Sequence, residues 1–261
     1  MSPRWLLLIV LCLGARPAWA GAFAQRQGML LAIHEIASTI ALQGYDARGK
    51  LGQSPLYSKN TATTAFEYGA LDWLTFLGRL EAARVYSSGP PIASYRGPGM
   101  SELGARIEIG RAHHGDIVFS TQALLRLPGA HTQNPAAAGL NRSETDLRLM
   151  TGGSFDIRDY PGFWSIEAGT RRRSGPEPDE WRAEAAVGQF LFDRLQLVVQ
   201  TLSVFTAKAP LIPQSRSHKA QASLILNPGR PWSLQFGTFR TLSGVNARRE
   251  TGLLLAWWRR M

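Results

Sequence analysis

Apolar and polar residues alternate along most of the chain after residue 28. In the clearest segment, residues 102–109, every second residue from Leu103 to Ile109 is apolar, and the positions between them carry Glu, Gly or Arg. The same alternation recurs around Ile117, Trp181 and Trp232. Successive side chains of a strand point to opposite faces, so this pattern predicts β-strands with one apolar and one polar face.

About twelve such segments, each of about ten residues, follow one another, which is the length that a tilted membrane strand needs. They begin near Gly28, Tyr57, Leu74, Gly99, Asp116, Glu144, Phe163, Asp179, Leu195, Ser217, Trp232 and Ala247. Short connections near 70–73, 112–115, 156–162, 192–194 and 227–231 alternate with longer ones near 43–56, 87–98, 129–143, 174–178 and 206–216. A sixth connection, near 241–246, is short for the second set. The pattern predicts an all-β, antiparallel transmembrane β-barrel of the outer-membrane type, with both termini on the periplasmic side.

The first twenty residues read as a secretory signal peptide. Arg4 precedes an apolar run, and the segment ends in Ala18-Trp19-Ala20, a typical cleavage site. We expect cleavage after Ala20 and a single barrel domain over residues 21–261. The only cysteine, Cys12, lies in the signal, so the mature chain has none. The formal net charge of +10 becomes +8 because two arginines leave with the signal.

Composition removes several other classes of protein. With 44% hydrophobic residues the chain is not intrinsically disordered, and one cysteine cannot form a disulfide framework. A mean hydropathy of −0.12 is too low for a polytopic helical membrane protein, whereas a barrel averages its two faces to such a value. A soluble β-sandwich or barrel also alternates and is the alternative.

Aromatic residues and the C-terminal strand favour the membrane barrel over the soluble one. Aromatic side chains gather beside the short connections, where the membrane–water interface would lie; they are Tyr68, Trp73, Phe163, Trp164, Phe190, Phe192 and Trp232. In the last strand Leu253, Leu255, Trp257 and Met261 share one face, as in barrel strands that the assembly machinery recognises, with Met in the final place where an aromatic residue is common. We therefore expect an exported protein of the outer membrane that contacts outer-membrane lipid, lipopolysaccharide and the barrel-assembly machinery.

Residues 67–74, with the sequence EYGALDWL, resemble the strand–turn–strand "YGLTDWL" element of the meta-pathway phenol degradation family of outer-membrane proteins. Gly97-Pro98-Gly99 followed by 103–106, and 127–129, resemble the glycine-led fourth strand of that family and its strand end before an external loop. Residues 232–235 and 257–260 are more weakly similar. Where the family usually has Asp soon after Gly-x-Gly, this chain has Ser101 and Glu102. The resemblance implies outer-membrane transport, often of aromatic or hydrophobic compounds.

Charged residues occupy the inward parity of the predicted strands, because an Arg or Lys that faces lipid near the midplane costs about 2–4 kcal/mol. The predicted lumen residues are Glu67, Arg79, Glu81, Glu102, Arg106, Glu108, Arg126, Asp146, Arg148, Glu167, Arg171, Arg182, Glu184 and Glu250. They would form ion pairs that fill and rigidify a narrow barrel, or line a polar pore that selects solutes, and both roles can hold together because a twelve-stranded barrel is intermediate in width. The leading hypothesis is passive diffusion of a small-molecule solute through this lumen.

Two alternatives stay open. One is a lipid-modifying hydrolase at the barrel rim that uses His131 and Ser143, although no nucleophile motif surrounds either residue. The other is a closed structural barrel filled by ion pairs and by residues 21–28.

Other sites are weakly indicated. The pair His113-His114 lacks a third metal ligand nearby, and residues 151–154 lack the lysine of a phosphate-binding loop. We expect no catalytic residues, metal or other cofactor, and no nucleic-acid partner. The basic runs 171–173 and 248–249 are candidates for contact with outer-leaflet phosphates.

Overall fold

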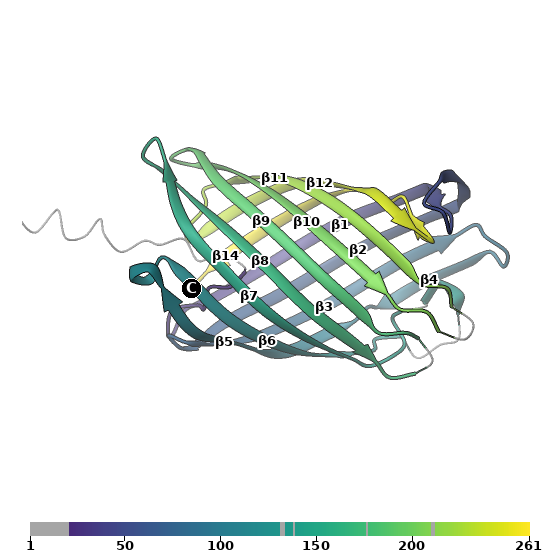
Figure 1. The fold of residues 1–261 in the computed structure, drawn as a ribbon, viewed down its shortest axis with the longest axis horizontal. Helices are drawn as coiled ribbons and strands as arrows, with labels where there is room; N and C mark the ends of the chain where they lie inside the picture. The colour runs from purple at the N-terminus through teal and green to yellow at the C-terminus, as the bar shows by residue number, and fades with distance from the viewer. Residues whose placement is uncertain (1–20, 131–133, 138, 176, 210–211) are drawn as a thin grey trace, which may run out of the picture.

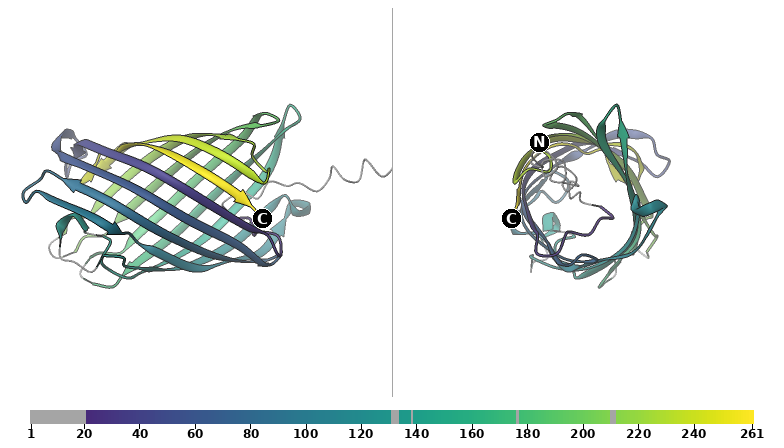
Figure 2. Two further views of the ribbon diagram at one scale, coloured as in Figure 1. Left: turned by 180° about the vertical axis from the view of Figure 1, so that it is seen from behind. Right: turned by 90° about the vertical axis from the view of Figure 1, so that its left-hand side faces the viewer.

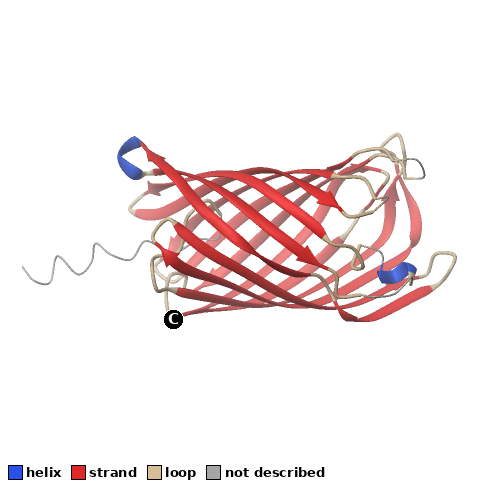
Figure 3. Ribbon diagram, turned by 90° about the horizontal axis from the view of Figure 1, so that it is seen from below, coloured by secondary structure: helices blue, strands red, loops and turns tan. Residues whose placement is uncertain are grey.

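The computed structural model describes residues 21–261 except 131–133, 138, 176 and 210–211. The predicted signal peptide and His131 therefore lie outside the described residues. The described chain forms a closed antiparallel β-barrel (Figure 1). Strands account for most of it, and the two short 3-10 helices, η2 (His113–Gly115) and η3 (Pro135–Ala137), lie at opposite ends (Figure 3).

The barrel wall consists of twelve strand paths, as predicted. Two paths are interrupted: β4 and β5 both pair with β3, and β13 and β14 both pair with β1. The strands are β1 (Leu30–Tyr45), β2 (Leu51–Leu71), β3 (Leu74–Ser87), β4 (Ala93–Pro98), β5 (Ser101–Ala112), β6 (Ile117–Leu127), β7 (Glu144–Ile157), β8 (Tyr160–Arg173), β9 (Glu180–Phe192), β10 (Leu195–Thr206), β11 (Ser215–Leu226), β12 (Trp232–Val245), β13 (Ala247–Arg248) and β14 (Thr251–Arg260).

Each of the twelve strand paths pairs with its neighbours in sequence, and β1 closes the barrel against β14, from Leu31 opposite Arg260 to Ile40 opposite Thr251. The first described residues and the C-terminus lie at the same end (Figure 2). This end, which also carries the short connections, is called the turn end, and the opposite end, with the longer connections, is called the loop end.

Two of the predicted long connections are instead mostly strand. The expected loop 43–56 is a paired extension of β1 and β2 with a turn at 46–50, in which the Asp46 carboxylate accepts hydrogen bonds from the amides of Arg48 and Lys50. Residues 93–98 of the expected loop 87–98 form β4. A strand segment that extends beyond the membrane can carry polar residues and glycine, because its outer face meets water. A change to polar composition therefore did not mark where these strands end.

The outer surface of the barrel carries an apolar belt. Large apolar side chains such as Leu80, Leu149 and Leu253 are exposed on it, as the alternation predicted. No helix in the described part of the chain is long and apolar enough to span a bilayer. Tyr68 and Trp73 are exposed beside the first short turn, where interfacial rings were expected.

The prediction that Phe163 and Phe190 belong to the aromatic residues at the membrane–water interface is wrong. Both pack inside the barrel, against an apolar cluster on its inner face. Phe163 has the parity of Ser165, whose side chain also faces inward, and its ring occupies the space over Gly188 on β9. Proximity to a short turn does not fix which face a ring takes.

Candidate functional site: the barrel lumen

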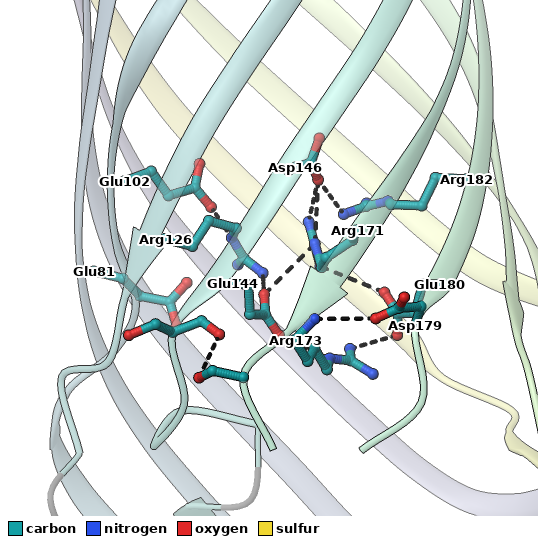
Figure 4. A network of polar contacts seen from close by, with 12 residues as sticks. Glu81, Glu102, Arg126, Glu144, Asp146, Arg171, Arg173, Asp179, Glu180 and Arg182 are labelled. Atoms are coloured by element: carbon teal, nitrogen blue, oxygen red, sulfur yellow. Dashed lines mark hydrogen bonds and ion pairs between the residues drawn. The ribbon is translucent and has the colours of Figure 1, made fainter. Parts of the chain in front are cut away.

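A charged wall lines the lumen along β5–β9. At its centre is Asp146, which is only 1% exposed and faces three guanidinium groups. An Asp146 carboxylate oxygen lies 2.7 Å from Arg148 Nε, and the other lies 2.9 Å from Arg171 Nη2 and 3.8 Å from Arg182 Nη1. Figure 4 shows Arg171 and Arg182 converging on Asp146 from neighbouring strands.

The network continues toward the loop end through three residues that the sequence analysis missed. Glu144 binds Arg126, Arg171 and Arg173, and Arg173 in turn lies 2.5 Å from Glu180 (Figure 4). Glu144, Arg173 and Glu180 each lie two positions from a predicted lumen residue on the same strand, so extending the parity by one step would have found them.

The charges of this network nearly cancel. Five arginines and six carboxylates are connected by ion pairs; they are Arg126, Arg148, Arg171, Arg173 and Arg182 with Glu102, Glu144, Asp146, Glu167, Glu180 and Glu184. The positive charge of the chain is therefore not concentrated in this network. Mutual pairing lets many ionised groups share a narrow space without uncompensated burial.

The other predicted lumen residues also pair on the inner face. Glu67 lies 3.3 Å from Arg106. Glu81 lies 3.2 Å from Lys59 and 3.8 Å from Arg79. Nearer the ends, two further predicted carboxylates have basic partners: Glu108 pairs with Arg111 at 2.5 Å, and Glu250 pairs with Lys219.

An apolar wall lies opposite the charged network and was not predicted. Its buried members are Leu31, Val198, Ile225, Ala256 and Trp258, on β1, β10, β11 and β14, and they form one cluster with Phe163 of β8. The last strand is apolar on both faces, so its alternation did not reveal which side chains face inward.

Residues 21–28 cross the lumen at the turn end, as the closed-barrel alternative expected (Figure 2). The Gln25 backbone amide donates to Thr75 Oγ1 at 2.8 Å, and the Gln25 side-chain amide donates to Glu67 Oε2 at 2.9 Å. Arg106 Nη1 donates to the Phe23 carbonyl at 2.9 Å, and the Ser120 hydroxyl donates to the Ala22 carbonyl. Each contact uses a side chain from the wall, so the segment is held as a plug.

Two cavities lie along the lumen. The turn-end cavity, of about 610 Å³, is lined by Phe23, Arg111, Phe190 and Arg260 among others. The inner cavity, of about 430 Å³, lies between the charged and apolar walls and includes two residues the sequence analysis missed, Glu35 and Gln200. Phe163, 4% exposed, lines both cavities. The Phe163 ring and the plug therefore separate the cavities.

The connection between β6 and β7 narrows the loop end. Its residues Ala130, Ala137 and Leu140 pack onto Ala83 and Val85 on the inner face of β3. Asn134 donates a hydrogen bond to the Ser94 carbonyl at 2.7 Å, which ties this connection to β4. Chain segments thus narrow the lumen at both ends, residues 21–28 at the turn end and the β6–β7 connection at the loop end.

Of the two residues of the predicted rim hydrolase, His131 lies outside the described residues. Ser143 is described, and its carbonyl accepts a hydrogen bond from Ser174. A different pair, Ser203 and His218, is joined at 2.8 Å on the outer face, but the residues in register beside it, Ala183 and Ser243, carry no carboxylate to orient the imidazole. In the described part of the chain no cluster of three metal-ligating side chains occurs.

Comparison with known proteins supports the fold but not a family. No family model matches the chain, and no curated protein matches it. The meta-pathway phenol degradation family therefore stays an expectation from the sequence.

Solved structures share the architecture. An outer-membrane channel from Pseudomonas putida F1 superposes with a TM-score of 0.78 at 16% identity, over 94% of this chain and 100% of that one. The translocator domain of the autotransporter NalP from Neisseria meningitidis has a TM-score of 0.59 at 12% identity, over 98% and 93%. The β domain of the Bordetella autotransporter BrkA has a TM-score of 0.57 at 11% identity, over 88% and 100%. The predicted outer-membrane type of β-barrel is confirmed, and because the same fold serves channels and autotransporters, function rests on the lumen.

Proposed function

We propose that this protein is a gated channel of the outer membrane, which passes a small solute down its gradient. The observation that carries the proposal is the pair of lumen cavities between which the Phe163 ring and the plug of residues 21–28 lie. A barrel with a purely structural role has no need of two cavities in line. We place the turn end in the periplasm, since short turns face that side in outer-membrane barrels.

The walls of the inner cavity favour a solute with one apolar side and one polar group. Ile33, Val198 and Trp258 offer it apolar surface, while Arg79 and Gln200 offer hydrogen bonds. A cavity of about 430 Å³ suits a small molecule rather than a polymer. Such a solute fits the aromatic or hydrophobic compounds that the sequence resemblance implies. Export through the predicted signal peptide and insertion by the barrel-assembly machinery are part of this proposal.

The gate is tested by recording single channels of refolded protein in planar bilayers. We expect brief, small openings of the unaltered protein and a larger, longer-lived conductance for Phe163→Ala, because the side chain between the cavities is removed. The matched control is Phe236→Ala, which truncates a ring that is 48% exposed on the outer surface and should leave conductance unchanged. The absence of conductance in all three proteins, together with no solute entry into liposomes, would overturn the channel proposal.

A further inference from the structure

Two arginines face each other on the outer surface of the barrel near the loop end. Arg84 of β3 and Arg96 of β4 are register partners on antiparallel strands, and both are exposed. Their neighbours on β3, Ala83 and Val85, are buried against the inner cluster, so Arg84 points outward. Of the basic run 171–173 that the sequence singled out for lipid contact, Arg171 and Arg173 point into the lumen ion pairs, and Arg172 alone is on the exposed outer face.

No acidic side chain lies in register with the two arginines. Asn60 of β2 is opposite Arg84 on its other side, and the next outward-facing pair toward the loop end is Tyr86 with Ser94. Among the described residues, none forms an ion pair with Arg84 or Arg96. Like charges directly opposite each other on one face destabilise a strand pair. The two guanidinium groups therefore repel each other, and an external anion that bridges them would remove this repulsion.

The depth of the pair along the barrel indicates which anion it meets. Phe76 and Leu80, on the same face of β3, are exposed members of the apolar belt. Arg84 lies four residues beyond Leu80, about 13 Å along a strand and about 9 Å along the membrane normal for a strand tilted by about 45°. Tyr86 follows as an exposed aromatic residue. The two guanidinium groups are thus placed at the level of lipid headgroups rather than in the hydrocarbon.

We infer that Arg84 and Arg96, with the Asn60 amide beside them, bind a phosphate group of a phosphorylated lipid in the outer leaflet. Guanidinium groups present planar pairs of donors that match phosphate oxygens, and charge-assisted bonds of this kind are about twice as strong as neutral ones. The site lies outside the lumen, so the inference does not depend on the proposed channel function.

Native mass spectrometry of the full-length protein in detergent micelles tests the site, with bisphosphorylated lipid A as the probe. We expect the double variant Arg84→Gln/Arg96→Gln to bind lipid A about 10- to 100-fold more weakly, as the loss of two charge-assisted contacts predicts. The matched control is Arg172→Gln/Arg240→Gln, two exposed arginines that face Thr145 and Ala220 in register rather than another arginine. This control should stay within about twofold of the unaltered protein.

Two further arms identify the ligand and guard against misfolding. Dephosphorylated lipid A should bind no better to the unaltered protein than to the double variant, and millimolar inorganic phosphate should not displace lipid A. Arg84→Glu should lose lipid A binding while keeping or raising the thermal stability, because it creates an ion pair with Arg96. Equal binding by the double variant and its control, equal binding of dephosphorylated lipid A, or displacement by inorganic phosphate would overturn the assignment to lipid phosphate.

Discussion

The two walls of the lumen are stabilised in different ways. The charged wall holds its side chains by ion pairs around the buried Asp146, whereas the apolar wall packs Leu31, Ile225 and Trp258 as the core of a soluble protein would. Charge-assisted hydrogen bonds are directional and fix the orientation of both side chains, whereas apolar contacts are non-directional. We therefore assign rigidity to the charged wall and adaptable solute contact to the apolar wall.

The largest effect should come from the centre of the charged wall. Asp146→Ala leaves Arg148, Arg171 and Arg182 without their shared carboxylate. Breaking a buried network in this way costs about 3–5 kcal/mol of unfolding free energy. Urea titration of the refolded barrel in lipid vesicles, followed by tryptophan fluorescence, measures it. A loss below about 1 kcal/mol would show that the network contributes little to rigidity.

The next effect tests the apolar wall. Ile225→Ala removes a side chain that is 2% exposed and leaves a cavity, which costs about 2–4 kcal/mol. Its neighbour Leu226 is 40% exposed on the outer surface, so Leu226→Ala creates no comparable cavity and serves as the control. The same titration compares them. Equal losses for the two variants would contradict the inward packing of Ile225.

Gly188→Ala perturbs the junction of the two walls with a smaller cost in stability. A Cβ atom there would lie 1.9 Å from Phe163 Cε1, so the ring must move. We expect overpacking to cost about 1–3 kcal/mol and the displaced ring to increase single-channel conductance. At Gly78 nothing lies within 4 Å of an added Cβ, so Gly78→Ala is the control. If Gly188→Ala has unchanged single-channel conductance, Phe163 is not part of the gate.

The smallest effect belongs to the edge of the charged wall. The Glu184 side chain is 29% exposed and lies 3.3 Å from Arg148 and 3.4 Å from Arg182, both of which have other partners. Glu184→Gln should therefore cost about 0.5–1 kcal/mol in the urea titration, and less at high salt. A loss as large as that of Asp146→Ala would mean that the contribution of a carboxylate to the stability of this network does not depend on its burial.

Much of the fold could be predicted from the alternation of apolar and polar residues along the strands. Of the two lumen walls, however, only the charged one could be predicted in this way. Glu102, Arg106 and Asp146 could be assigned to the lumen because charge is tolerated on that face alone. Leu254 and Leu255 cannot be assigned in the same way, since an apolar side chain suits both lipid and lumen. Pairing between distant strands decides their direction, and the alternation within a single strand carries no information about it.

The ends of the barrel show the same limit. The plug formed by residues 21–28 could be named as a lumen filler from its position before the first strand. Its partners could not be named, because Thr75, Arg106 and Ser120 meet it only once the barrel has closed.

A reversible cross-link between the plug and the barrel wall tests whether residues 21–28 form the gate. The Ala22 Cβ lies 3.4 Å from the position of a Cβ on Gly152, within the reach of a disulfide, although the added side chain requires a small shift at the Trp164 carbonyl. In a Cys12→Ser background, we would record Ala22→Cys/Gly152→Cys in planar bilayers before and after reduction, with Gly152→Cys alone as the control. We expect that the oxidised protein does not open, that reduction restores the openings, and that the reductant leaves the conductance of the single variant unchanged. Equal conductance of the oxidised and reduced forms would contradict a gate formed by residues 21–28.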